Sequence, residues 1–227
     1  MSHDALQLQP LVLWGATGQA IVLGEFCEQV GYKLTALFDR APALRSPFDG
    51  VPLFAGEQGF EEWRHQHPGP IPCAVAIGGY RGADRLERLS YLLEQGLRAV
   101  ELTHPRAMVA SNVKRGSGVQ ILAGATIAAR AVLGDAVIVN HGAVVEHECE
   151  LEAGVHMGPG ATLCGVVRIG RCTLVGAGAV VLPRVRIGAN SIVGAGSVVT
   201  RDIPDNVIAF GNPARIIGPR PANALTV

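Results

Sequence analysis

The chain has little charge and few aromatic side chains. Charged residues make up 17% of its 227 residues, aromatic residues make up 5%, and the formal net charge at pH 7 is +0. A nucleic-acid-binding surface needs a basic surplus, so this composition argues against one. With few aromatic residues and 29 glycines, the chain must pack small side chains in a regular architecture. The length suits one large domain or two small ones.

Long apolar runs and paired cysteine motifs are also missing. No run of about 18 apolar residues occurs, and no charged-then-apolar leader follows Met1. The cysteines are odd in number and include no CxxC pair, which fits reduced thiols rather than a disulfide framework or a zinc knuckle. They are Cys27, Cys73, Cys149, Cys164 and Cys172. We therefore expect a cytoplasmic protein without a membrane or nucleic-acid partner.

The first part of the chain alternates between strand and helix patterns. Short apolar runs predict strands, and longer periodic segments predict helices, the last with leucines at helical spacing. The predicted strands are 11–14, 34–38 and 73–77, and the predicted helices are 19–30, 58–65 and 83–95. This β-α-β order predicts a small Rossmann-like α/β domain over residues 1–103, with a parallel sheet flanked by helices.

After His104-Pro105 the pattern changes to a period of six. From Val109 to Val199 every sixth residue is apolar, except Arg115. The residue two places before each of these is always Ala, Val, Cys, Thr or Ser, and glycine often follows the apolar position. A six-residue repeat suits one short strand plus one bend, and such repeats bury their faces only by stacking into a solenoid. A β-sandwich would instead show period two broken by irregular turns.

This array resembles the hexapeptide-repeat acyltransferases, whose repeat is [Leu/Ile/Val]-Gly-x-x-small-x. The resemblance implies a left-handed parallel β-helix with three faces and 18 residues per coil, here over 104–227 with a closing segment at 201–215. Gly15-Ala16-Thr17-Gly18-Gln19, Phe38-Asp39, Ala76-Ile77-Gly78, Asn140 and 145–149 (Val-Glu-His-Glu-Cys) resemble one subfamily. It contains nucleotide-sugar N-acetyltransferases of the bacillosamine and perosamine type and sialic acid O-acetyltransferases.

The subfamily block implies candidate catalytic residues. By resemblance, His147 is the general base, Glu148 raises its basicity, and Asn140 is a polar active-site residue. Imidazole suits this role because its pKa lies near working pH. One coil after His147 lies Gly165, which leaves room beside the imidazole and exposes a backbone N–H. That N–H is a candidate donor to the thioester carbonyl, although a glycine there could equally just make a turn.

The resemblance also implies acetyl-CoA as co-substrate and a homotrimer whose active sites lie at subunit interfaces. Acetyl-CoA is expected in a groove between neighbouring β-helices. His156 matches a cofactor-contacting histidine of the family. Ala177 and Ala195 match positions whose backbone meets the pantetheine arm, and their spacing of 18 stacks them on one edge.

The N-terminal half is expected to hold the nucleotide sugar. Residues 15–20 follow a strand and open a helix, so their N–H groups can cradle a phosphate. The motif lacks G-x-G-x-x-G, which argues against a dehydrogenase. By family match, Thr17, Gly18, Gln19, Asp39, Arg40 and Gly78 are assigned to substrate. Gln19 stands where the family often has histidine, and the residues after Gly79 also depart from the family pattern, so the exact sugar stays open.

We therefore predict an acetyl-CoA-dependent N-acetyltransferase acting on a nucleotide-linked 4-amino-6-deoxy sugar. A sialic acid O-acetyltransferase is the alternative, and a non-catalytic trimeric nucleotide-binding or scaffold protein is a remoter one. A zinc-dependent carbonic anhydrase needs three convergent histidines. His141, His147 and His156 are six and nine residues apart, so His141 and His147 fall on different faces of one coil, too far apart to share an ion within a subunit. No metal is therefore expected.

Overall fold

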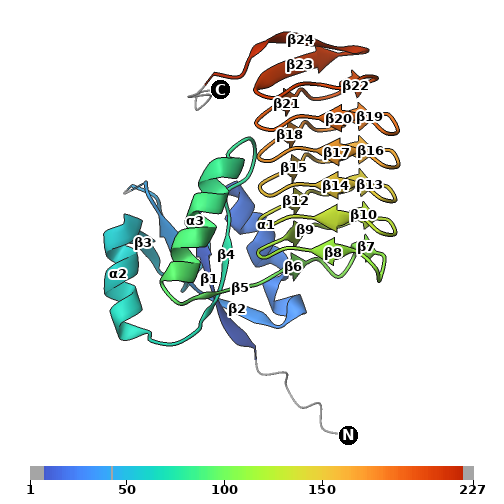
Figure 1. Cartoon of the computed structure of the whole chain (residues 1–227). Helices are drawn as coiled ribbons and strands as arrows, with labels where there is room; N and C mark the ends of the chain where they lie inside the picture. The colour runs from blue at the N-terminus through green and yellow to red at the C-terminus, as the bar shows by residue number, and fades with distance from the viewer. Residues whose placement is uncertain (1–7, 42, 222–227) are drawn as a thin grey trace, which may run out of the picture.

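The computed structural model describes residues 8–41 and 43–221, which form an α/β unit joined to a β-helix (Figure 1). The α/β unit has a parallel sheet with strand order β3-β2-β1-β4-β5. The strands are β1 (Gln9–Trp14), β2 (Tyr32–Asp39), β3 (Leu53–Ala55), β4 (Pro72–Val75) and β5 (Arg98–Ala99). The helices are α1 (Gly18–Phe26), α2 (Gly56–Gln66) and α3 (Gly82–Glu94), with a 3-10 turn over Cys27–Val30. The predicted fold class is confirmed, and each predicted strand and helix of this unit overlaps one observed here.

Helices cover both sides of this sheet. On one side α1 packs its buried residues Ala20, Leu23 and Phe26 against leucines of β1 and β2. On the other side α2 and α3 pack over an aromatic cluster in which the rings of Trp14 and Phe60 lie near one another. Strand order reverses between β1 and β4, and ligands of open α/β sheets bind at the carboxyl ends of the strands at such a point.

The β-helix has three flat faces built from two-residue strands. Face 1 holds β6 (Leu102–Thr103), β9 (Gln120–Ile121), β12 (Ile138–Val139), β15 (His156–Met157), β18 (Leu174–Val175) and β21 (Ile192–Val193), extended by β23 (Val207–Gly211) and β24 (Ala214–Pro219). Face 2 holds β7 (Met108–Val109), β10 (Thr126–Ile127), β13 (Val144–Val145), β16 (Thr162–Leu163), β19 (Val180–Val181) and β22 (Val198–Val199). Face 3 holds β8 (Lys114–Arg115), β11 (Val132–Leu133), β14 (Glu150–Leu151), β17 (Arg168–Ile169) and β20 (Arg186–Ile187).

Paired two-residue strands are offset by one coil of 18 residues, as when Val145 pairs with Leu163. The second residue of most of these strands points inward, so the core is a stack of aliphatic side chains. Arg115, the one polar residue in the hexad series, is exposed on β8 in the first coil, where it binds Glu101 at 2.7 Å. The predicted boundary between residues 103 and 104 falls at the end of β6, which already pairs with β9.

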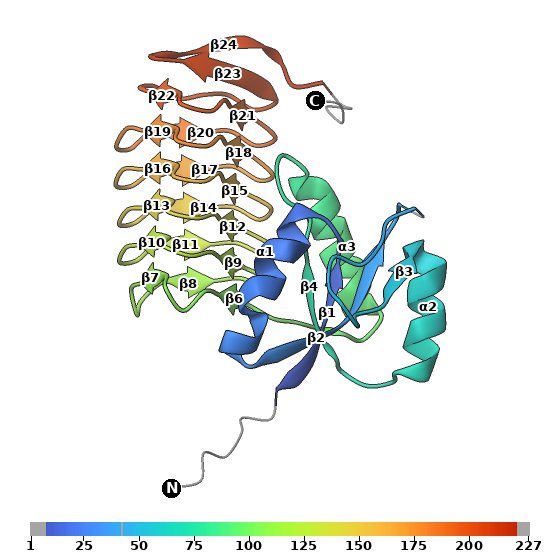
Figure 2. The same ribbon diagram turned by 180° about the vertical axis from the view of Figure 1, so that it is seen from behind.

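The α/β unit packs against face 1 (Figure 2). Gln120 on β9 is fully buried there, where its Nε2 donates to Val75 O at 2.8 Å and its Oε1 accepts from Gln19 Nε2 at 2.7 Å. The N-terminus of α3 lies so close to the turn before β15 that a Cβ at Gly82 would collide with Gly154 O. These contacts fix the end of the parallel sheet beside one edge of the β-helix. Within the described ranges, no helix is both long and apolar enough for a membrane span.

Candidate active site

A crevice of about 410 Å³ opens where the carboxyl end of the parallel sheet meets the β-helix. On the β-helix side it is lined from the edge that joins face 1 to face 2, which we call the crevice edge. Seven of the predicted site residues line it: Thr17, Gly18, Gln19, Asp39, Gly78, Asn140 and His156. Residues from the N-terminal half and from the β-helix, far apart in sequence, therefore share one cavity.

Asp39 connects the two loops at the mouth of the crevice. Its Oδ2 accepts from Ala16 N at 2.9 Å, and its Oδ1 accepts from Ala41 N at 3.0 Å. The turn after β1 is also pressed against β4, because a Cβ on Gly15 (φ 111°) would lie 2.8 Å from the carbonyl carbon of Ala76. Only glycine suits that conformation and that approach. The phosphate-binding turn predicted at the start of α1 is thus held in place before any ligand arrives.

His156 and Asn140 form a buried pair in the crevice. Asn140 Oδ1 accepts from the backbone N–H of His141 at 2.8 Å, which orients Asn140 Nδ2 toward His156 Nε2 at 3.2 Å. His156 Nε2 is therefore the acceptor, and the proton of a neutral imidazole lies on Nδ1. Within the described ranges this buried Nδ1 has no hydrogen-bond partner.

Burial and the nearby charge of Arg85 lower the pKa of His156 to about 3. A protonated imidazole is disfavoured there because it would lose its water and face a second cation. His156 is consequently neutral at working pH, and because its Nε2 already accepts from Asn140, it is not the base.

His147 lies on a different edge, which joins face 2 to face 3 and which we call the outer edge. Its imidazole lies directly beneath Gly165 of the next coil, where an added Cβ would lie 2.5 Å from His147 Nε2. His147 Nδ1 lies 3.4 Å from Glu148 Oε2, and both side chains are about half exposed. Arg130 of the previous coil lies 3.4 Å from the other oxygen of Glu148.

One chain does not bring these two groups together. The crevice is formed at face 1, whereas the outer edge joins face 2 to face 3, on the side of the β-helix turned away from the α/β unit (Figure 1). Asn140 and His156 therefore lie with the predicted substrate residues, while His147, Glu148 and Gly165 lie apart from them. The exposed Ala177 and Ala195 stack on the crevice edge above His141, linked by the bond from Gly196 N to Ala177 O at 2.8 Å.

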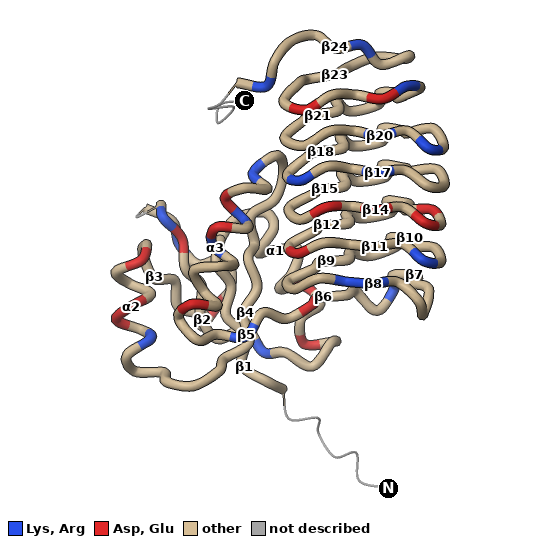
Figure 3. Tube along the Cα trace, viewed as in Figure 1, with Lys and Arg blue, Asp and Glu red and all other residues tan. Residues whose placement is uncertain are grey.

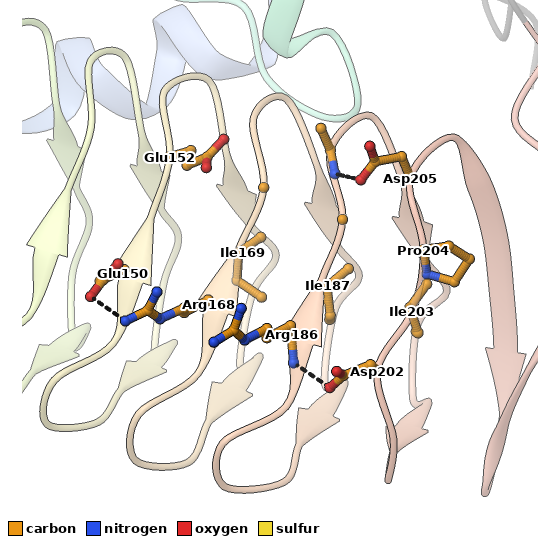
Figure 4. A pocket seen from close by; sticks show the side chains of 13 residues that line it. Glu150, Glu152, Arg168, Ile169, Arg186, Ile187, Asp202, Ile203, Pro204 and Asp205 are labelled. Carbon is orange, nitrogen blue, oxygen red and sulfur yellow. Dashed lines mark hydrogen bonds and ion pairs between the residues drawn. The ribbon is translucent and has the colours of Figure 1, made fainter.

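A larger hollow of about 720 Å³ lies on face 3, and it contains none of the predicted site residues (Figure 4). Several of its charged groups are already bonded. Arg168 pairs with Glu150 at 3.2 Å, while Asp202 accepts from Arg186 N and Asp205 accepts from Ala189 N, both at 2.8 Å. We regard this hollow as part of a charged face, and Figure 3 marks charged residues of both signs along the β-helix.

Comparisons with known proteins place this geometry in a family. The family profile described as bacterial transferase hexapeptide (six repeats) matches residues 167–201. A crystallised variant of perosamine N-acetyltransferase from Caulobacter crescentus, in complex with CoA and GDP-perosamine, is 38% identical with a TM-score of 0.84. The alignment covers 95% of this chain and 100% of that one. The chain belongs to the hexapeptide-repeat acyltransferases.

Two further solved structures extend the comparison of this hexapeptide-repeat acyltransferase. The acetyltransferase domain of PglB from Neisseria gonorrhoeae FA1090, in complex with acetyl coenzyme A, is 29% identical with a TM-score of 0.82, over 92% of this chain and 100% of that one. WeeI from Acinetobacter baumannii AYE, at 21% identity and a TM-score of 0.77 over the same shares, supports the fold. No curated protein matched in sequence. The predicted family and enzyme class, an acetyltransferase, are confirmed.

Two groups at the site were not predicted from sequence, and one predicted residue lies beside the crevice. Arg40 lines an adjoining cavity of about 320 Å³ that also contains Asp39, and it lies 3.5 Å from Glu87. Gln120 and Arg85 were missed, although both hold the crevice together. The burial of Arg85 could have been predicted from the sequence, because Arg85 lies on the same face of the helix as Leu89 and Leu92.

Proposed function

We propose that the protein transfers the acetyl group of acetyl-CoA to the amino group of a nucleotide-linked 4-amino-6-deoxy sugar. The observation that carries this proposal is the similarity, over nearly both full lengths, to an enzyme crystallised with CoA and GDP-perosamine. The crevice at the sheet's switch point supports it, because that is where α/β folds hold nucleotide ligands. Acetyl-CoA supplies an activated thioester.

We propose a composite active site in a homotrimer, with the outer edge of one copy facing the crevice edge of the next. In such a ring, face 2 lies toward the threefold axis. The outward residues of face 2 are uncharged: Met108, Thr126, Val144, Thr162, Val180 and Val198. On face 3 the corresponding positions include Lys114, Glu150, Arg168 and Arg186. Charge is depleted from the cores of interfaces, which supports face 2 as the buried one.

In this arrangement each residue at the outer edge has a distinct task. His147 Nε2 accepts the proton that the sugar nitrogen loses as its N–C bond to the acetyl carbonyl forms. The C–S bond breaks, and His147 returns the proton to the leaving sulfur. Glu148 faces Nδ1 and stabilises the imidazolium. Gly165 N–H donates to the carbonyl oxygen as it gains charge.

The crevice holds the acceptor. The N-terminal turn of α1, at Thr17 to Gln19, presents backbone N–H groups to the diphosphate. Asp39 keeps lone pairs for the nucleoside while it bonds Ala16 N and Ala41 N. His156, whose Nε2 accepts from Asn140 Nδ2, lines the same crevice and is the residue proposed to contact acetyl-CoA there.

An acceptor panel tests the activity. We expect release of free CoA thiol with acetyl-CoA and a nucleotide-linked 4-amino sugar, and none with free sialic acid. Turnover on sialic acid alone, with an unchanged KM in Asp39→Ala, would replace the proposal with sugar O-acetylation. CoA binding without turnover on any acceptor would favour a non-catalytic role.

A mixing experiment tests the composite site. His147→Ala disables the outer edge, and His156→Ala disables the crevice. If they act in trans, random mixed trimers of the two inactive chains contain wild-type sites at about one in four positions. We expect co-expression to restore about that share of activity. Activity no greater than the sum of the separate variants would contradict a shared site.

A further inference from the structure

Arg85 is the largest fully buried side chain of the described residues, and it has no acidic partner there. It lies on α3 and is 0% exposed. Its Nε donates to Ala136 O, its Nη1 to Ile77 O and its Nη2 to Gly154 O, each at 2.8 Å. All these acceptors are main-chain carbonyls. Burial lowers the pKa of Arg85 to about 10, so the group is still protonated at neutral pH.

A buried cation that bonds only to carbonyl groups is unusual and requires a structural explanation. Buried charges are usually paired, because removing them from water is strongly unfavourable. Arg88, one turn further along α3, follows that rule by bonding Glu57 and Glu87. Arg85 differs because its acceptors come from both units of the fold. Ile77 follows β4 in the α/β unit, whereas Ala136 and Gly154 lie in the turns before β12 and β15.

The segment that Arg85 holds is one wall of the crevice. Ile77 immediately precedes Gly78, where an added Cβ would lie 3.6 Å from His156 Cε1. The far end of the same wall is held similarly, because Arg220, just after β24, donates to Tyr80 O at 2.7 Å. The wall above His156 is therefore attached to the β-helix at both ends by arginine side chains.

The charge of Arg85 also acts on His156, because it adds to the effect of burial in lowering the pKa of that imidazole. The charged residues that line the crevice itself are Asp39 and Arg81. Asp39 accepts two backbone N–H bonds, and Arg81 Nε donates to Asp84 at 2.8 Å. The charge of Arg85 has no such carboxylate bond among the described residues, and it disfavours a second cation at His156.

We propose that Arg85 is a positioning residue that fixes the Ile77–Gly79 wall against the β-helix and keeps His156 neutral, so that its Nε2 accepts the hydrogen bond from Asn140 in the crevice. It touches no substrate itself and acts through His156 and the wall. The kinetic part of this inference rests on the proposed function, whereas the structural part does not.

The first test is the titration of His156 by NMR in protein labelled at histidine, assigned with His156→Gln. In the wild-type protein we expect no protonation of His156 down to about pH 4. Arg85→Gln removes the charge, and we expect the His156 midpoint to rise by about one unit or more. Arg85→Lys keeps the charge and leaves the midpoint low. Arg64→Gln is the matched control, because Arg64 also caps a carbonyl, Gln95 O at 3.0 Å, but far from the crevice.

The second test is kinetic. Because Lys cannot reach three carbonyls at once, Arg85→Lys loosens the wall, and we expect KM for the nucleotide sugar to rise about tenfold. KM for acetyl-CoA and the values for Arg64→Gln are expected to stay near wild type. An unchanged His156 midpoint in folded Arg85→Gln overturns the inference. If Arg85→Gln does not fold, a wild-type sugar KM in Arg85→Lys overturns it. The titration holds even if no acetyl transfer is found, so the two proposals fail separately.

Discussion

The crevice edge and the outer edge follow the same repeat but present very different chemistry. On the crevice edge the turn after β12 contains Gly142 in the left-handed region (φ 63°), and its Asn140 is half-buried beside the fully enclosed His156. On the outer edge the turn after β13 has Glu148 in the same conformation (φ 57°), and its His147 is exposed. Left-handed backbone is unfavourable for a residue with a Cβ by about 1 kcal/mol or more.

That difference indicates how the two edges share the work. Within the crevice the α/β unit already encloses His156 and half-buries Asn140, so these two groups are fixed in one chain. The outer edge keeps a strained carboxylate beside an exposed imidazole, and water weakens its electrostatics until another surface covers it. The exposed base of one copy is therefore suited to complete the crevice of a neighbouring copy, which has no base of its own.

The largest effect is expected for His147→Ala. Loss of a general base lowers kcat by about 10²–10⁴. The exposed side chain supports little of the fold, so the melting temperature and CoA affinity should stay near wild type, as measured by thermal shift and calorimetry. More than about half the wild-type rate would show that the outer edge does not carry the base.

Gly165→Ala is expected to follow, with a fall in kcat of about 10². Gly165 lies outside the left-handed region, and the three atoms nearest to the new methyl group all belong to the His147 ring, which must move aside. Gly218→Ala is the matched control, because an added Cβ there meets nothing within 4 Å. Equal kcat values for Gly165→Ala and Gly218→Ala would contradict the prediction, because they would show that the position of the His147 ring does not affect catalysis.

The β-helix was predictable in detail because every coil repeats one local rule. Each six-residue step specifies one strand and one bend, so the 18-residue offset that stacks Gly165 on His147 follows from counting. The α/β unit was predictable only in its longer elements. β3 and β5 were missed because they are three and two residues long and have no periodicity of their own.

The crevice was predictable only in part, for a physical reason. Asn140 and His147 are seven residues apart in sequence, yet the coil places them on different edges, and no local pattern shows which edge the α/β unit covers. Docking depends on single buried polar residues such as Gln120 and Arg85. Their role appears only when main-chain carbonyls from distant segments converge on them.

A smaller effect is expected in the pH dependence of stability, and it distinguishes the buried histidine from the exposed one. The pKa of His156 is lowered to about 3 in the folded state, against about 6.5 when unfolded. Between these values only the unfolded chain binds this proton, so stability falls as pH falls through that window, by at most about 1.4 kcal/mol per pH unit. The melting temperature should therefore fall less between pH 7 and pH 4 for His156→Gln than for wild type. An equal slope would show that His156 is protonated in the folded protein.

The smallest effect is expected for Glu148→Gln. Its carboxylate lies between His147 Nδ1 and Arg130 Nη2, each at 3.4 Å, and these side chains are largely exposed in one chain, so water and salt weaken both interactions. Glutamine keeps an acceptor near Nδ1 but loses the charge that stabilises the imidazolium, so we expect kcat to fall about threefold to tenfold with KM unchanged. Arg130→Gln is the control: it frees Glu148 from its second partner and should leave the rate equal to or slightly above wild type. If kcat fell as far in Glu148→Gln as in His147→Ala, the trimer would have to bury the outer edge completely. The outer edge and the crevice edge would then be equally shielded from water in the assembled enzyme.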